Sequence, residues 1–121
     1  MDRPRGAFSS VQEGSALVVS LPVRVDVSVA REMLDVLERA VADSQTNIVL
    51  DLRDTQSLDS TALGAIVTVL KKCRAEAGDL VLACVGEGVK RVLAITRLDR
   101  VMGVYETRQK AVGRFLENEQ P

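Results

Sequence analysis

The sequence predicts a single α/β domain, in which a mixed, mostly parallel β-sheet is flanked by about four helices in the order ββαβαβαβα. Short apolar segments rich in β-branched residues alternate with longer segments whose apolar residues recur at helical spacing. The length of 121 residues suits one domain, and 46% apolar with 27% charged residues is the balance of a globular protein. The domain is expected at 15–117, between a flexible leader at 1–14 and a frayed tail at 118–121.

Five segments have the apolar, β-branched character of strands. They are expected at 17–21, 23–27, 47–52, 80–85 and 101–105. Pro22 cannot donate a ladder hydrogen bond and therefore separates the first two, which we expect to form an antiparallel pair. The later strands are each separated by a helix, so they are expected to be parallel.

Four segments have helical spacing. The first is expected to start at an N-cap on Ser28 and to end near Ala42. The second follows Asp59 and is expected to end at a C-terminal cap on Gly78. The third follows the turn at 86–88. The last begins near Arg108, and four of its residues are expected in the core: Ala111, Val112, Phe115 and Leu116.

The composition excludes several kinds of function. The chain has no histidine, so it cannot build a Ser-His-Asp or Cys-His nucleophile system. A net charge of -1 and only three aromatic residues argue against binding to nucleic acid or to a membrane surface. Two cysteines are too few for a disulfide framework or a cysteine-rich zinc site. We therefore expect a cytoplasmic protein without enzymatic activity, cofactor or metal.

The most informative stretch is 51–72, DLRDTQSLDSTALGAIVTVLKK. It predicts a buried strand, a polar loop, and a helix that begins at Asp59-Ser60-Thr61. A helix N-terminus has unpaired N–H groups and a positive dipole end, so an anion on Ser60 would be favoured there. Gly64 lies inside the helix, where glycine costs about 1 kcal/mol relative to alanine. A purely structural interpretation is that Asp59 or Ser60 caps the helix and Gly64 permits close packing.

Three blocks of the sequence resemble the STAS-domain anti-sigma factor antagonists. DSTALG at 59–64 is similar to the D-S-[ST]-G-L-G signature of that family. GVKRVLAITRLDRVMGVYET at 88–107 resembles its V-K-R-L-F-x-x-x-G-L segment, and LPVRVDVSVAREML at 21–34 resembles its L-x-G-E-[LI]-D-x-x-[TS]-A-x-x-L segment. The resemblance as a whole covers about 100 residues, and the three blocks occur in the family's order.

The resemblance implies a function. The serine matching the family's phosphorylated residue is Ser60. The unphosphorylated protein would bind an anti-sigma factor that is also a serine kinase, and so release a sigma factor. Phosphorylation would end that binding, and a PPM-type phosphatase would reverse it. The chain is expected to be a monomer on its own, and the residues expected to contact the partner are Arg24, Asp26, Asp59, Ser60, Thr61, Ala62 and Gly64.

The sequence departs from the family pattern at three places. The family's Gly-Glu pair is Val23-Arg24 here, which reverses a charge on a segment that commonly faces the kinase. Ala62 replaces a glycine and is expected to add a methyl group near Ser60. Arg97 stands where the later block has a glycine. These changes leave the identity of the partner open.

Two other functions are weighed against this one. A STAS subunit that docks on a transporter or lipid-transport ATPase needs no phosphorylatable serine, so the intact Asp-Ser-Thr sequence weighs against it. A small enzyme or nucleotide-binding protein would need a glycine-rich phosphate loop, which no predicted strand precedes. The two cysteines are expected to be buried free thiols, Cys73 on the apolar stripe of the second helix and Cys84 within a strand, and a redox bridge between them is the minor alternative. A basic stretch is either a solvated face or a rim contact to an acidic partner: Lys90, Arg91, Arg97 and Arg100.

Overall fold

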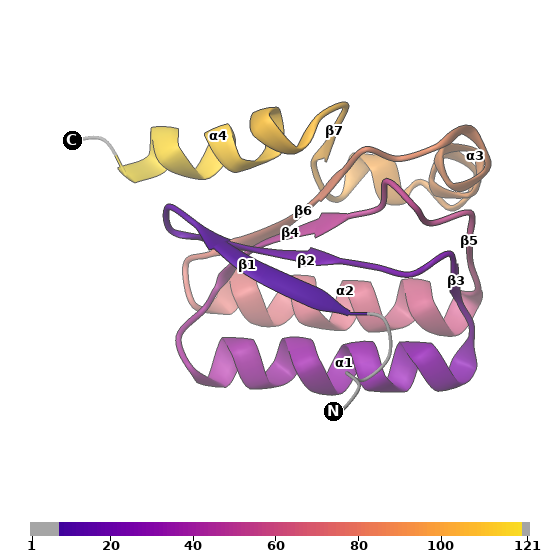
Figure 1. Cartoon of the computed structure of the whole chain (residues 1–121), viewed down its shortest axis with the longest axis horizontal. Helices are drawn as coiled ribbons and strands as arrows, with labels where there is room; N and C mark the ends of the chain where they lie inside the picture. The colour runs from indigo at the N-terminus through magenta and orange to yellow at the C-terminus, as the bar shows by residue number, and fades with distance from the viewer. Residues whose placement is uncertain (1–7, 120–121) are drawn as a thin grey trace.

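The computed structural model describes residues 8–119. A five-stranded sheet has the order β1-β2-β4-β6-β7, and a separate pair of short strands, β3 and β5, lies at one end of the molecule (Figure 1). The strands are β1 (Ser9–Glu13), β2 (Ala16–Ser20), β3 (Arg24–Val25), β4 (Asn47–Asp51), β5 (Ser57–Leu58), β6 (Asp79–Ala83) and β7 (Val104–Tyr105). The helices are α1 (Val27–Ala42), α2 (Ser60–Ala75), α3 (Glu87–Thr96), the short 3-10 helix η1 (Leu98–Arg100) and α4 (Arg108–Glu119).

The predicted fold class is confirmed: four α-helices flank a mixed sheet in which β2, β4, β6 and β7 are parallel. The antiparallel pair near the start is formed by different segments from those expected. Strand β1 pairs with β2, with Ser9 opposite Ser20 and Glu13 opposite Ala16. Residues 9–13 therefore belong to the sheet, and the prediction of a leader through residue 14 is wrong for them. Residues 1–7 and 120–121 lie outside the described residues, and α4 continues to Glu119, into the predicted tail.

The segment expected as a second long strand contributes only β3. Valines at 23, 25 and 27 alternate as in a half-buried strand, yet only Val25 is buried. Val23 and Val27 are each 47% exposed. The strand is this short because Asp26 already caps α1, which starts at Val27. The predicted cap on Ser28 is therefore wrong by two residues.

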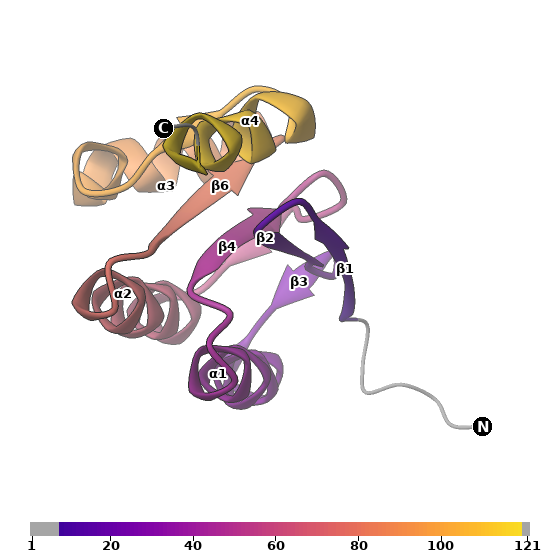
Figure 2. The same ribbon diagram turned by 90° about the vertical axis from the view of Figure 1, so that its left-hand side faces the viewer.

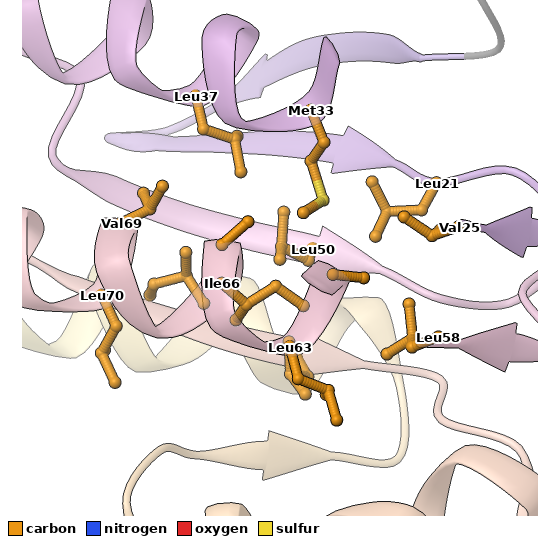
Figure 3. Packing of buried hydrophobic residues seen from close by; sticks show 14 of the residues in the cluster. Leu21, Val25, Met33, Leu37, Leu50, Leu58, Leu63, Ile66, Val69 and Leu70 are labelled. Carbon is orange, nitrogen blue, oxygen red and sulfur yellow. The ribbon is translucent and has the colours of Figure 1, made fainter. Parts of the chain in front are cut away.

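The core has two parts, one on each face of the sheet. Helices α1 and α2 run side by side under one face, and α4 crosses the other (Figures 1 and 2). Figure 3 shows Met33 and Leu37 of α1 meeting Ile66 and Val69 of α2 over Leu50 of β4. The smaller cluster lies under α4 and consists of Ala16, Val18, Val49, Val81, Ala83, Ala111, Val112 and Phe115. Leu116, expected in this core, is 44% exposed.

Two buried aspartates join α4 to the sheet. Arg108 of α4 contacts Asp51 at 3.4 Å and Glu13 at 2.6 Å. Arg114 of α4 pairs with Asp79, the first residue of β6. Burying a carboxylate is costly unless it is paired and hydrogen-bonded, and both aspartates meet this condition. No helix among the described residues combines the length and apolar character needed to cross a bilayer.

Candidate functional site

The site is the end of the molecule where α1 and α2 begin, held together by the pairing of β3 with β5 (Figure 1). In this parallel pair Arg24 lies opposite Ser57, and Val25 opposite Leu58. Val25 and Leu58 are buried, whereas Arg24 and Ser57 are exposed. Alternation along the two strands therefore sends one pair of side chains into the core and the other to the surface beside the helix starts.

The loop before β5 is fixed by hydrogen bonds to the segment before α1. The Gln56 backbone N–H donates to the Val23 carbonyl at 2.7 Å. Thr55, which is 4% exposed, donates from its hydroxyl to the Pro22 carbonyl at 2.8 Å. The sequence prediction did not single out Thr55, because a lone threonine in a polar loop has no pattern that shows its burial. Its buried hydrogen bond anchors the loop from which α2 starts.

Asp59 is the N-cap of α2. Its backbone is extended, with φ -89° and ψ -179°, and its carboxylate accepts a hydrogen bond from the Ala62 backbone N–H at 2.9 Å. Its own N–H donates to the Val25 carbonyl at 3.3 Å. Asp59 thereby fixes the first residue of the helix, which is Ser60. The predicted helix start is confirmed.

Ser60 and Thr61 both expose their side chains at this helix start. The Ser60 hydroxyl sits where the unpaired N–H groups and the dipole give α2 its positive end. Gly64 is one turn further on and also exposed, and a methyl group built on it would meet no atom within 4 Å. The interpretation that Gly64 permits close packing within the fold is therefore wrong.

Ala62 does not face the surface. Its side chain is fully buried in the core shared by α1 and α2. The prediction that Ala62 adds a methyl group near Ser60 and contacts a partner is wrong. Residues two apart on a helix point in nearly opposite directions, so Ala62 faces the core while Ser60 faces the surface. The other predicted contact residues, Arg24, Asp26, Asp59, Ser60, Thr61 and Gly64, retain exposed or half-exposed positions at this end.

The two cysteines lie apart and are both free thiols. Cys73 is fully buried among the residues of α1 and α2, whereas Cys84 packs against the cluster under α4. Burial, with a smaller effect from the charge of Asp79, raises the pKa of Cys73 to about 11. The predicted redox bridge is wrong for this fold, because the sheet separates the two clusters. Within 8–119 no group of three or more acidic or cysteine side chains is arranged to hold a metal ion.

The fold and the exposed serine define a class of protein: a small α/β domain whose candidate site is a surface at a helix start rather than a cleft. The STAS domain family matches residues 7–111. The chain belongs to that family. Its sequence is 43% identical over 65 residues to a candidate anti-sigma factor antagonist of Thermotoga neapolitana. That match spans 54% of this chain and 58% of the relative.

Solved structures show the same fold. A candidate anti-sigma factor antagonist from Thermotoga maritima superposes with a TM-score of 0.82 at 28% identity, covering 88% of this chain and 92% of the other. SpoIIAA, a Bacillus anti-sigma factor antagonist, superposes with TM-scores of 0.70 in its unphosphorylated form and 0.71 in its phosphorylated form. These two matches, at 18% and 20% identity, cover 90% of this chain and 97% and 99% of theirs. The fold thus matches both forms of that protein equally well.

Proposed function

We propose that the chain is an anti-sigma factor antagonist of a partner-switching pathway. The unphosphorylated form binds an anti-sigma factor that is also a serine kinase, and a sigma factor is thereby released. Phosphorylation of Ser60 ends the binding, and a PPM-type serine phosphatase restores it. The observation that carries the proposal is the exposed position of Ser60 as the first residue of α2, beside its cap Asp59.

Phosphorylation is compatible with this position. The Ser60 oxygen forms a bond to the γ-phosphorus of ATP, the bond to the β-phosphate oxygen breaks, and ADP leaves. The hydroxyl proton passes to a base of the kinase. The product adds about -1.5 to -2 charges at the positive end of α2, where the dipole favours an anion by about 0.3–1 kcal/mol at an exposed site. The fold of this chain is therefore expected to survive the modification.

The effect of the phosphate then falls on the partner. A partner surface that accepts a neutral hydroxyl would have to accommodate a dianion, and a negative group of the partner brought against that dianion at the interface costs several kcal/mol. Each ~1.4 kcal/mol is a factor of ten in affinity, so a loss of about two decades requires no refolding. The equal match of this fold to both forms of SpoIIAA supports a change in affinity rather than in fold.

Two exposed valines extend the proposed contact surface. Val23 and Val27 flank Arg24 and Asp26 at the start of α1, and each is about half exposed. Apolar side chains beside a charged pair are typical of an interface that excludes water around its polar contacts. Because position 24 is an arginine, we propose that the partner presents an acidic or neutral group there.

The test uses the anti-sigma factor kinase of the host as the binding partner. Binding is measured by calorimetry for the wild type, Ser60→Ala and Ser60→Asp. Thr107→Asp is the matched control, because Thr107 also lies at a helix start and accepts a hydrogen bond from the Lys110 N–H, and aspartate is an equally good cap. It adds the same charge at the start of α4, on the other face of the sheet.

We expect Ser60→Ala to bind as tightly as the wild type and to take up no phosphate. Ser60→Asp is expected to lose about a hundredfold in affinity, and Thr107→Asp to lose none. Mass spectrometry of the protein from its host should find the phosphate on Ser60 rather than Thr61. Tight binding by Ser60→Asp would contradict the proposal and favour a subunit that docks constitutively on another protein.

A further inference from the structure

Helix α3 has an outer face that the core does not use. Val89 and Leu93 face inward and are buried. Ile95, on the opposite side, is 75% exposed, the highest exposure of any large apolar residue among those described. Arg91 is also exposed and lies one turn before Ile95, so the two side chains are neighbours on the helix surface. An isoleucine so exposed beside an arginine contributes little to the stability of this fold.

Arg97 is the C-cap of α3, and its backbone has a conformation that glycine adopts more easily than any other residue. Its backbone is left-handed, with φ 64° and ψ 18°, and its N–H donates to the Ala94 carbonyl at 3.1 Å. Glycine adopts this conformation without the steric cost that a side chain brings. The side chain of Arg97 is exposed. The chain therefore carries a guanidinium at a place where a smaller residue would suit the fold better.

The three arginines on and just after α3 form no ion pair with another described residue, unlike several arginines elsewhere in the chain. Arg74, Arg108 and Arg114 each have a carboxylate within 4.0 Å. The ion pairs between described residues include none of Arg91, Arg97 and Arg100, all of which are exposed. Three exposed cations close in sequence to an exposed apolar residue are complementary to an acidic surface with an apolar anchor.

We propose that the surface formed by Arg91, Ile95, Arg97 and Arg100, here called the α3 surface, docks an acidic, amphipathic segment of a protein partner. Ile95 would pack against the apolar face of that segment while the arginines pair with its carboxylates. A protein fits better than an anionic polymer or a membrane because the net charge of the chain is -1 and Asp99 lies between two of the arginines. Apolar anchors ringed by polar contacts are typical of protein interfaces.

The α3 surface belongs to α3 and η1, whereas Ser60 belongs to α2. Helix α3 begins next to the loop before β5, where Gly88 lies close to the Gln56 carbonyl, at the end of the molecule that holds β3 and β5 (Figure 1). Arg97 lies ten residues beyond the first residue of the helix, or about 15 Å along its axis. We expect docking at the α3 surface to be independent of the phosphate on Ser60, because the two sites lie on different helices.

The test uses a fluorescent peptide of about fourteen residues, four helical turns, with leucines on one face and glutamates on the others. Binding is followed by anisotropy, and the contacted residues are mapped by amide NMR shifts. Arg97→Gly and Ile95→Ser are each expected to weaken binding at least about fivefold. Ala77→Gly is the matched control, because Ala77 has the same left-handed backbone, with φ 65°, after α2 and carries no charge.

Arg97→Gly and Ala77→Gly should both keep a melting temperature equal to or above that of the wild type, since each relieves the same backbone conformation. Only Arg97→Gly should weaken the peptide, and Ser60→Asp should leave its binding unchanged. The proposal is overturned if the peptide shifts no residue of the α3 surface, or if Arg97→Gly binds as well as the wild type. Stronger binding of a short DNA duplex or anionic vesicle, insensitive to Ile95→Ser, would also overturn it.

Discussion

Asp26 and Asp59 occupy equivalent positions at the starts of two neighbouring helices. Each follows a two-residue strand, and the two strands are paired in parallel with Val25 opposite Leu58. Each has an extended backbone, and each carboxylate accepts a hydrogen bond from the N–H three residues later, at 3.2 Å for Asp26 and 2.9 Å for Asp59. The pairing of β3 with β5 therefore brings two positive helix ends to one surface.

This arrangement predicts how the two caps contribute to stability. Asp26→Ala and Asp59→Ala are each expected to lower the free energy of unfolding by about 1 kcal/mol, the usual value of an N-cap. Asp59→Asn should lower it by only a few tenths, because asparagine caps a helix about as well as aspartate does. Urea unfolding followed by circular dichroism measures all three. An equal loss for Asp59→Asn and Asp59→Ala would mean that charge, rather than the capping hydrogen bond, is the stabilising element.

Replacing Gly64 by alanine is expected to raise the stability of the chain and to weaken its binding to the anti-sigma factor. Because a methyl group there meets no atom within 4 Å, Gly64→Ala should raise the free energy of unfolding by about 1 kcal/mol through helix propensity alone. The same methyl group projects from the exposed side of α2, one turn after Ser60, and should weaken binding of the anti-sigma factor about tenfold by preventing close approach. Urea unfolding and calorimetry measure the two effects.

The control for this experiment is Gly113→Ala on α4. That position is also open to a methyl group but lies on the other face of the sheet. Gly113→Ala should gain a similar stability and leave binding unchanged. If Gly64→Ala binds the anti-sigma factor as tightly as the wild type, the α2 face at residue 64 is outside the interface.

The elements with long patterns were predictable from the sequence. The apolar residues of β6 are all buried, as the run predicted at 80–85 indicated, although the strand starts at Asp79 and ends at Ala83. Helix α4 begins at Arg108 as predicted. The helical start at Ser60 followed from a capping residue directly before an apolar stripe. Such signals are local, so the surrounding fold does not change them.

The errors have two physical causes: pairing between segments distant in sequence, and the exact residue at which each helix begins. Strand β1 has no buried residue that a pattern could reveal, and it is a strand because β2 offers it hydrogen-bonding groups. β3 ends at Val25 because the next residue, Asp26, caps α1. Ala62 points inward because it lies two residues after Ser60 and so on the opposite side of α2. The pairing with β2 therefore makes residues 9–13 a strand, and the starts of α1 and α2 determine where β3 ends and where Ala62 points.

Gly78 is required by a contact with Thr46, a residue distant in sequence, and not by the conformation of the helix end. It was expected to supply a left-handed C-terminal cap, but Ala77 holds that conformation. Glycine is needed at 78 because a methyl group would overlap the carbonyl group of Thr46, whose oxygen accepts a hydrogen bond from Asp79 at 2.9 Å. Gly78→Ala is thus expected to cost about 3 kcal/mol or lead to no stable fold. Thermal unfolding measures it against Gly113→Ala, and a change of less than half that size would show that the backbone at 46 yields easily.

The buried thiol of Cys73 predicts a loss of stability at high pH. Its pKa is about 11 in the folded chain against 9.0 for an unperturbed cysteine thiol, so the folded state keeps a proton that the unfolded state loses between these pH values. The stabilising effect of this residue is complete below pH 9 and falls as the pH approaches 11. Urea unfolding at pH 8 and pH 10.5 should therefore show a smaller alkaline loss for Cys73→Ala than for the wild type, although the variant is less stable at both. Equal alkaline losses would show that Cys73 ionises as readily in the folded chain as in the unfolded one.

A thiol reagent at pH 8 should label Cys84, which is partly exposed, well before Cys73. Rapid labelling of Cys73 would mean that α2 opens often enough to expose the core beneath Ser60.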